Sequence, residues 1–429
     1  MNAKAKPRRR TVVVSEGVSL PYPSFSPAVR FDDWIFAAAQ SAADYEGGLA
    51  EEVRGNPAMP LIGEDDRFRE SHCIFDKLST TLEAAGGKLD RSLRIDQFPT
   101  TRAIMDAYHN VRTARMSQPR PASTSVVIDG LLAPVARIGV ELVSLANDAA
   151  VDIEPVIPGN VPHSLFGIVP AIKAGDFVFV AAQVATDFKT GLAPEARRNP
   201  AFWQGSEIEL QTRYILRNFE TVLQAAGSSL ANVVKATVYL TDMNDLPRLD
   251  RVWKEAFPSD PPVRTILPAS GLGVADACIE INLVALTDNG GTMKEVIHLP
   301  EYLQSPFHES TAIRAGNLLL TSGLMAADSN GLVQEARVNP HNPFTSSTTQ
   351  IQTQNILERA EQICTAAGAH LRDAVRMLTA HTDLGEFAWS RVAMLEAFPE
   401  GEPATTSLKV RGPLAVPDAS VMLDLWIGI

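Results

Sequence analysis

The chain has 429 residues, a length that predicts about three domains rather than one. Its composition, 45% hydrophobic and 21% charged, is that of a globular protein, and no run approaches the roughly 18 consecutive apolar residues that a membrane span needs. A net charge of −12 without a local basic patch argues against nucleic-acid binding. The cysteines lack C-x-x-C spacing and the histidines are scattered, so the sequence predicts no metal site and favours a reducing cytoplasm.

The chain repeats itself three times. An A-A-G motif ends at Gly86, Gly227 and Gly368, so both intervals are 141 residues. A second motif, E-x-R-x-N-P, also occurs three times, around Arg54, Arg197 and Arg337. Such self-similarity indicates one structural unit used three times. We therefore predict domains over residues 1–151, 152–292 and 293–429.

The middle copy shows the order of elements most clearly. An apolar, β-rich run predicts a strand, an amphipathic stretch that stops at Gly227 predicts a helix, and a strand, a second helix and two strands follow. The predicted ranges are 177–184, 207–226, 233–240, 246–257, 263–267 and 278–286. Strands and helices do not alternate strictly, which favours the α+β class over a doubly wound sheet.

Two residues of the middle copy are the candidates for chemistry. Arg264 begins one predicted strand, and Glu280 lies within the next. A carboxylate on a strand otherwise built for burial needs a partner, and taken alone the two residues can form a structural ion pair. The repeat favours a functional role, because the first and third copies lack both groups. The matching positions are Ser123 and Thr405 for the arginine, and Gly139 and Met422 for the glutamate.

The middle copy resembles the Rid family (YjgF, or reactive-intermediate deaminases). The resemblance lies in A-G-D-F-V-F-V-A-A-Q ending at Gln183, in L-Q-A-A-G ending at Gly227, in P-S-D-P-P-V-R ending at Arg264 and in I-E-I around Glu280. It extends more weakly over the other two copies. It implies a chorismate-mutase-like α+β fold that forms homotrimers with active sites between subunits. Three fused copies would form such a trimer within one chain.

The resemblance also implies a chemistry and a set of site residues. Arg264 would hold the carboxylate of a small imine or enamine acid, and Glu280 would activate the water that attacks the C=N carbon, without a cofactor. The substrate-binding residues would be Arg264, Asp250, Phe166, Ser322 and Gly323. Because clefts are shared between copies, Ser322 can face Arg264 across a joint, and the sequence leaves open which copies adjoin.

Several positions depart from the family pattern. Ala181 replaces the early-strand serine that many relatives carry. Asp250 replaces an asparagine of the second helix, with His109 and Arg391 at the matching places of the other copies. These departures suggest a larger or different substrate.

Other arginines are weaker candidates. The arginine of E-x-R-x-N-P occurs in every copy, so we expect it to bind a carboxylate or carbonyls across a joint. Arg120 and Arg411 are either surface residues or new anion sites in the outer clefts.

Three functional hypotheses follow. The first is a hydrolytic deaminase of a small carboxylated imine, enamine or related C–N compound, acting through one cleft with Arg264 and Glu280. The second is a chorismatase-like hydrolase, since those enzymes are also built from fused Rid-like copies. The third is a non-catalytic protein that binds a small carboxylate metabolite or acts as a chaperone. In each case we expect a monomeric pseudo-trimer or a further homo-oligomer of it, with no nucleic-acid or membrane partner.

Overall fold

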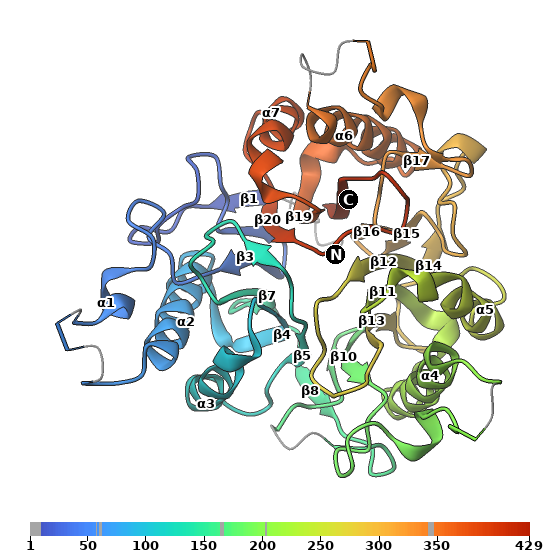
Figure 1. Ribbon diagram of the computed structural model, residues 1–429, viewed down its shortest axis with the longest axis horizontal. Helices are drawn as coiled ribbons and strands as arrows, with labels where there is room; N and C mark the ends of the chain where they lie inside the picture. The colour runs from blue at the N-terminus through green and yellow to red at the C-terminus, as the bar shows by residue number, and fades with distance from the viewer. Residues whose placement is uncertain (1–9, 57, 60–61, 164–166, 202–203, 342–346) are drawn as a thin grey trace, which may run out of the picture.

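Three units of similar design surround a common centre in the computed structural model (Figure 1). The structure describes residues 10–429 except 57, 60–61, 164–166, 202–203 and 342–346, so the predicted site residue Phe166 lies outside the described part. Each unit is built on one mixed sheet, and two long helices cover its outer face. The three sheets share one strand order, in which the last long strand of the unit lies between the third and fourth.

The first unit is built on the sheet β1-β2-β3-β7-β4-β5. Its elements are β1 (Arg10–Val13), β2 (Ala28–Phe31), β3 (Trp34–Gln40), α1 (Glu51–Arg54), α2 (Asp66–Ala84), β4 (Gly87–Pro99), the short η1 (Arg102–Ile104), α3 (Met105–Arg115), β5 (Ala122–Ser125), β6 (Gly130–Leu131) and β7 (Ile138–Ala146). The short strand β6 leaves this unit and pairs with the sheet of the third.

The middle unit follows the predicted order of elements closely. Its sheet, β12-β11-β13-β10-β9-β8, and its helices comprise β8 (Ile153–Val156), β9 (Ala171–Ala174), β10 (Phe177–Val184), α4 (Glu207–Ala225), β11 (Val233–Leu240), α5 (Leu246–Ala256), β12 (Val263–Pro268) and β13 (Ile279–Leu286). Gly227 has a φ of +70°, the left-handed conformation that ends a helix and that glycine adopts without strain.

The third unit repeats the design with its own sheet, β14-β15-β16-β21-β19-β20-β6. It comprises β14 (Lys294–Val296), β15 (Ala312–Ala315), β16 (Leu318–Thr321), β17 (Ala327–Asp328), β18 (Gly331–Leu332), α6 (Thr348–Ala366), β19 (Ala374–His381), α7 (Phe387–Ala397), β20 (Ala404–Lys409) and β21 (Val421–Gly428). The predicted boundaries near 151 and 292 fall between β7 and β8 and between β13 and β14.

Strand register confirms which residues match among the units. In each unit the fifth strand runs parallel to the fourth, and Arg264, Ser123 and Thr405 lie beside equivalent residues of that fourth strand. Glu280 and its counterparts Gly139 and Met422 likewise share one register position on the last long strand. The sequence intervals therefore identify structurally equivalent sites.

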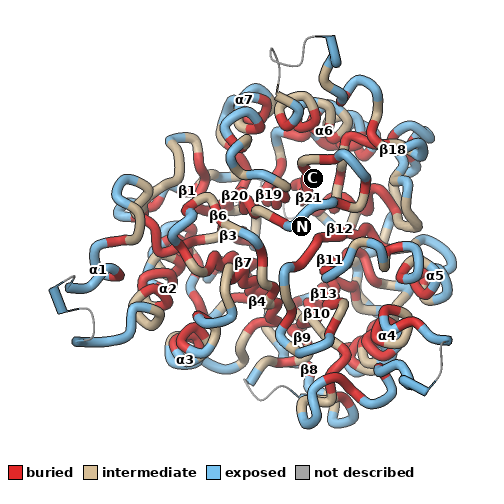
Figure 2. Tube along the Cα trace, in the orientation of Figure 1, coloured by how far each residue is buried: buried red, intermediate tan, exposed pale blue. Residues whose placement is uncertain are grey.

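Buried charges link the units where the inner faces of the sheets meet. Arg94, Lys235 and Arg376 occupy equivalent positions 141 residues apart. The ammonium of Lys235 contacts Asp424 of the third unit at 2.8 Å, and Arg376 of the third unit contacts Glu141 of the first. Each of these two cations thus pairs with an acid of the next unit. Figure 2 shows the buried backbone concentrated around this centre.

Arg94 departs from this pattern because its cross-unit acid is absent. The position that holds Glu141 in the first unit and Asp424 in the third is Asn282 in the middle unit. Arg94 instead contacts Asp96 on its own strand at 2.7 Å.

The E-x-R-x-N-P arginines act within their own loops, which corrects the expectation that they bridge joints. Arg54, Arg197 and Arg337 each donate to the carbonyl five residues earlier in the chain, at Leu49, Leu192 and Leu332. The motif therefore closes a loop.

No helix within the described residues is long and apolar enough to cross a membrane.

Candidate active site

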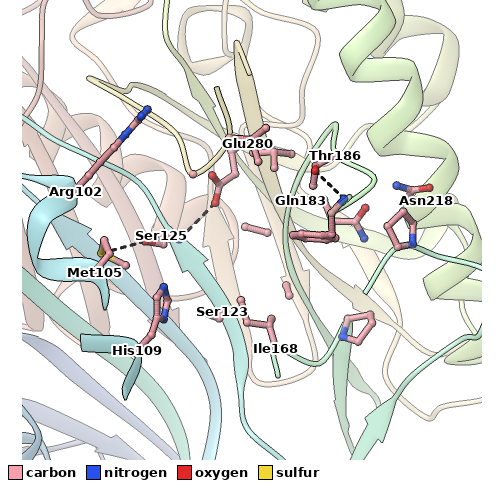
Figure 3. A pocket seen from close by; sticks show the side chains of 18 of the residues that line it. Arg102, Met105, His109, Ser123, Ser125, Ile168, Gln183, Thr186, Asn218 and Glu280 are labelled. Carbon is pink, nitrogen blue, oxygen red and sulfur yellow. Dashed lines mark hydrogen bonds between the residues drawn. The ribbon is translucent and has the colours of Figure 1, made fainter. Parts of the chain in front are cut away.

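A cavity of about 350 Å³ opens between the first and middle units (Figure 3). We call it the Glu280 pocket. The first unit contributes Ser123 and Ser125 from β5 and His109 from α3. The middle unit contributes residues 181–184 of β10 and the carboxyl group of Glu280. The walls between these polar groups are mostly apolar, formed by Met105, Ile168, Val184, Val274 and two prolines.

Glu280 has a raised pKa in this pocket. Its strand neighbours Ile279 and Ile281 belong to the core of the middle unit, so its own side chain points the opposite way, toward the first unit. The backbone N–H of Ser125 donates to Oε1 at 3.4 Å. Burial raises the pKa of Glu280 to about 8, the bond from Ser125 lowers it, and the Asp96 carboxylate raises it further. This carboxyl group can exchange a proton near neutral pH.

A bulge shapes the wall opposite β5. The register between β10 and β13 shifts between Val180 and Gln183, which leaves Ala181 and Ala182 out of the ladder. These two residues line the pocket. Bulges commonly bend a strand beside an active site, and this one places backbone next to Glu280.

On the side of the first unit, the pocket is also lined by the imidazole of His109 and the guanidinium of Arg102. Burial lowers the pKa of His109 to about 4 and the nearby Arg112 guanidinium lowers it further, so the imidazole is neutral at pH 7. Arg102 lies exposed at the pocket mouth and donates to the carbonyl of Leu272 in the middle unit at 2.7 Å. It thereby bridges the two units beside the cavity.

Arg264 does not reach this pocket. It lies beside Ala236 of β11, whereas Glu280 lies beside Tyr239 of the same strand. Positions 236 and 239 are three residues apart on one strand, so the side chains of Arg264 and Glu280 are on opposite faces of the sheet. The structure thus separates the two groups that the sequence predicts in one cleft.

Arg264 instead lies in the cleft between the middle and third units, where its side chain has no exposed area. Its guanidinium contacts Asp250 at 2.6 Å and Glu309 of the third unit at 3.1 Å, and it lies 5.0 Å from the ring centroid of Trp253. The carboxylates of the chain itself occupy the positions that a substrate carboxylate would need.

Three other predicted substrate-binding residues, Asp250, Ser322 and Gly323, lie at this second cleft. The backbone N–H of Gly323 donates to the carbonyl of Arg264 at 3.0 Å, so this segment of the third unit lies beside Arg264. Ser322 and Gly323 border a cavity of only about 20 Å³. Asp250 is ion-paired to Arg264. These residues therefore come together, but in a filled cleft.

Comparison with known proteins identifies the middle unit most clearly. Residues 159–287 match the family model described as Endoribonuclease L-PSP. A RutC family protein of Pyrococcus horikoshii is 38% identical over 132 residues, which are 31% of this chain and 96% of that protein. The chain belongs to the Rid/YjgF family.

Other known proteins align with different shares of this chain. The 3-aminoacrylate deaminase RutC of Acinetobacter baylyi is 33% identical over 31% of this chain and 96% of its own length. The crystal structure of yeast Mmf1 is 24% identical and aligns over 32% of this chain and 100% of that chain, with a TM-score of 0.28. A chorismatase structure aligns over 79% of this chain and 93% of that chain, with 11% identity and a TM-score of 0.49.

Several residues of this Rid-type pocket escape prediction from the sequence. Ser123 enters the sequence argument only as the place where an arginine is missing, and His109 only as a counterpart of Asp250. The 141-residue interval is the signal that points to both. It cannot say that Glu280 faces the first unit while Arg264 faces the third, because that depends on the order of the units around the centre.

Proposed function

We propose that this protein is a hydrolytic deaminase of a small carboxylated imine, enamine or related C–N compound, and that the reaction takes place in the Glu280 pocket. One observation carries the proposal: a buried carboxyl group with a pKa of about 8 borders an open cavity large enough for such a compound. Two relatives support it by name, the 3-aminoacrylate deaminase RutC and the Reactive Intermediate Deaminase A of Arabidopsis thaliana, the latter 29% identical.

The residues present are sufficient for a balanced reaction. Ionised Glu280 accepts a proton from water as the water oxygen bonds to the iminium carbon, and the C=N π electrons move to nitrogen. The protonated carboxyl then returns this proton to the amine. The C–N bond breaks as the carbonyl forms, and the hydroxyl proton passes to the ionised Glu280. The released ammonia then takes this proton and leaves as ammonium, which returns Glu280 to its ionised state. A pKa near the working pH lets one group both accept and return the proton.

The proposal includes the architecture. We infer that the units within 1–151, 152–292 and 293–429 are three Rid-type domains and that together they form a pseudo-trimer in one chain. The shared strand order and the matching register positions support this inference. A mass of 46.3 kDa by light scattering would fit a single pseudo-trimer, and a multiple of that mass would show further association.

Glu280→Gln tests the catalytic assignment. The amide keeps the size of the side chain and an acceptor for the Ser125 N–H, but it cannot accept the proton from water. We expect the rate of imine hydrolysis to fall by about 100-fold or more. The assay generates 2-imino acids in place with an amino-acid oxidase and follows 2-oxo-acid and ammonia release above the spontaneous rate.

Met422→Leu is the matched control, because Met422 occupies the equivalent position of the third unit and its volume is nearly kept. Its activity should equal that of the unmodified protein. Full activity in Glu280→Gln would remove the assignment. Turnover of chorismate but of no imine would favour a chorismatase-like hydrolase, and saturable 2-oxo-acid binding without any turnover would favour a binding protein.

A further inference from the structure

The pseudo-threefold arrangement gives three equivalent clefts, and in two of them the chain neutralises its own cation. Arg264 contacts Glu309 and Asp250 in the cleft between the middle and third units. In the cleft between the third and first units, Arg391 lies 3.5 Å from Glu402. Both cations therefore have a carboxylate of this protein as counter-ion.

The Glu280 pocket differs because a buried cation that contacts its lining lacks such a partner. Arg112 of α3 is 1% exposed, and its Nη1 donates to the Oγ of Ser123, which lines the pocket, at 3.0 Å. Nε and Nη2 of Arg112 have no hydrogen-bond partner among the described residues, and no ion pair between described residues includes Arg112. All the aspartates and glutamates of the chain lie in the described part.

The fold does not require a cation at this place. The residues 141 positions further along are Trp253 and then Met394, both buried and apolar. A charge without a counter-ion is costly to bury, and apolar residues of similar size fill the site in the other units. Arg112 therefore destabilises the first unit unless an anion from outside the chain compensates it.

Ser123 transmits the charge of Arg112 into the cavity. Its Oγ accepts from Nη1 of Arg112 at 3.0 Å and from Nε2 of Gln97 at 2.9 Å, and it donates to Oε1 of Gln97 over a longer 3.4 Å. A hydroxyl group has two acceptor positions and one proton to donate. With both acceptor positions used, the Ser123 proton is held only by the long bond to Gln97, and a ligand oxygen inside the pocket can take it over. Burial lowers the pKa of Arg112 most, Tyr108 raises it, and the positive charge of Arg120 lowers it further.

We propose that Ser123 and Arg112 form the anion-binding end of the Glu280 pocket and select ligands that carry a carboxylate. The Ser123 hydroxyl donates to a carboxylate oxygen of the ligand, and Arg112 acts through Ser123 as a positioning residue. The ligand then spans from this end to Glu280, whose side chain points into the same cavity (Figure 3). This assignment rests on the proposed reaction at Glu280 for its chemistry, but carboxylate binding can be measured without turnover.

Binding of 2-oxobutanoate and of its uncharged methyl ester to the full chain, measured by calorimetry, tests the proposal. The unmodified protein should prefer the acid by at least about tenfold, as expected for a charge-assisted hydrogen bond in a buried site. Arg112→Met should abolish this preference and weaken acid binding by at least about tenfold while leaving the ester unaffected. Ser123→Ala should weaken acid binding in the same direction, and Arg112→Lys should restore part of it.

The controls separate this proposal from a structural role and from the proposed function. Thr405→Ala, at the equivalent position of the third unit, should bind the acid as the unmodified protein does. Arg112→Met should melt at the same or a higher temperature, because a buried charge is removed. Equal binding of acid and ester by the unmodified protein, or unchanged acid preference in both Arg112→Met and Ser123→Ala, would overturn the assignment. Loss of turnover in Glu280→Gln with intact acid binding would leave it standing, whereas failure of the deaminase assay alone concerns only the proposed function.

Discussion

At the scale of single residues, the free energy of each buried charge depends on what lies beside it. Arg264 is compensated by two carboxylates and is closed to ligands. Glu280 has one weak backbone donor and no cation within ion-pair distance among the described side chains, so burial acts on it almost unopposed. A site for chemistry arises where the fold leaves a charge or a proton uncompensated.

The raised pKa of Glu280 predicts a pH-dependent stability. Its pKa is about 8 in the folded protein, against 4.5 for an ordinary glutamate, so between these values the folded state binds one more proton than the unfolded chain. Stability therefore falls as pH rises through this window, by at most about 1.4 kcal/mol per pH unit, and the loss is complete above pH 8. Glu280→Gln lacks this dependence. Denaturant unfolding from pH 4 to pH 9 measures this effect. The free energy of unfolding of the variant should rise relative to that of the unmodified protein up to about pH 8, and the difference should stay constant above it. A difference that does not change with pH would contradict the raised pKa.

At the scale of elements, local sequence signals specify the helices and strands of each unit. The long helix α4 ends where Gly227 adopts a positive φ, and the backbone N–H of Ser228 bonds back to the carbonyl of Leu223 at 2.8 Å. Gly86 and Gly368 have the same conformation at the equivalent helix ends. The repeated A-A-G motif is therefore a helix-ending signal, which is why it survives in all three units.

Gly227→Ala tests this element-scale argument. The added Cβ would meet no other atom within 4 Å, so the whole cost is the left-handed backbone, about 1 kcal/mol of unfolding free energy. Gly159→Ala is the control, because its surroundings are equally open and its φ lies outside the left-handed region. Thermal unfolding should show a lower midpoint for Gly227→Ala than for Gly159→Ala; equal midpoints would contradict the capping role.

At the scale of the whole molecule, the charged centre links the three units in a ring. Lys235 bonds to Asp424, to the Thr321 carbonyl at 2.7 Å and to Thr265 at 2.7 Å, and the first two partners belong to the third unit. Two of the three joints carry such a cross-unit pair. Fusion of the units into one chain permits this asymmetry, because each joint can evolve its own residues.

Lys235→Met should weaken the joint between the middle and third units. It leaves the buried Asp424 without its nearest cation, and breaking a buried pair in this way typically costs about 3–5 kcal/mol. Lys173→Met is the control, because its ion pair with Glu154 is largely exposed and should be worth less than about 1 kcal/mol. Urea unfolding compares the two; equal small losses would show that the central pair does not hold the units together.

Local sequence signals were enough to predict the repeat, the order of strands and helices, and the residues that match between copies. The predicted strand 177–184 and the predicted ends of both helices in the middle unit agree with the structure to within a residue, because periodicity and capping act over a few neighbouring positions. Which matching residues share a cavity depends on how the units pack against one another. Arg264 and Glu280 are close in sequence, yet strand alternation places their side chains on opposite faces of the sheet. Because of the order of the units around the centre, Arg264 contacts Glu309 of the third unit and Glu280 contacts Ser125 of the first. Contacts across a joint depend on how whole units pack, which no local pattern encodes.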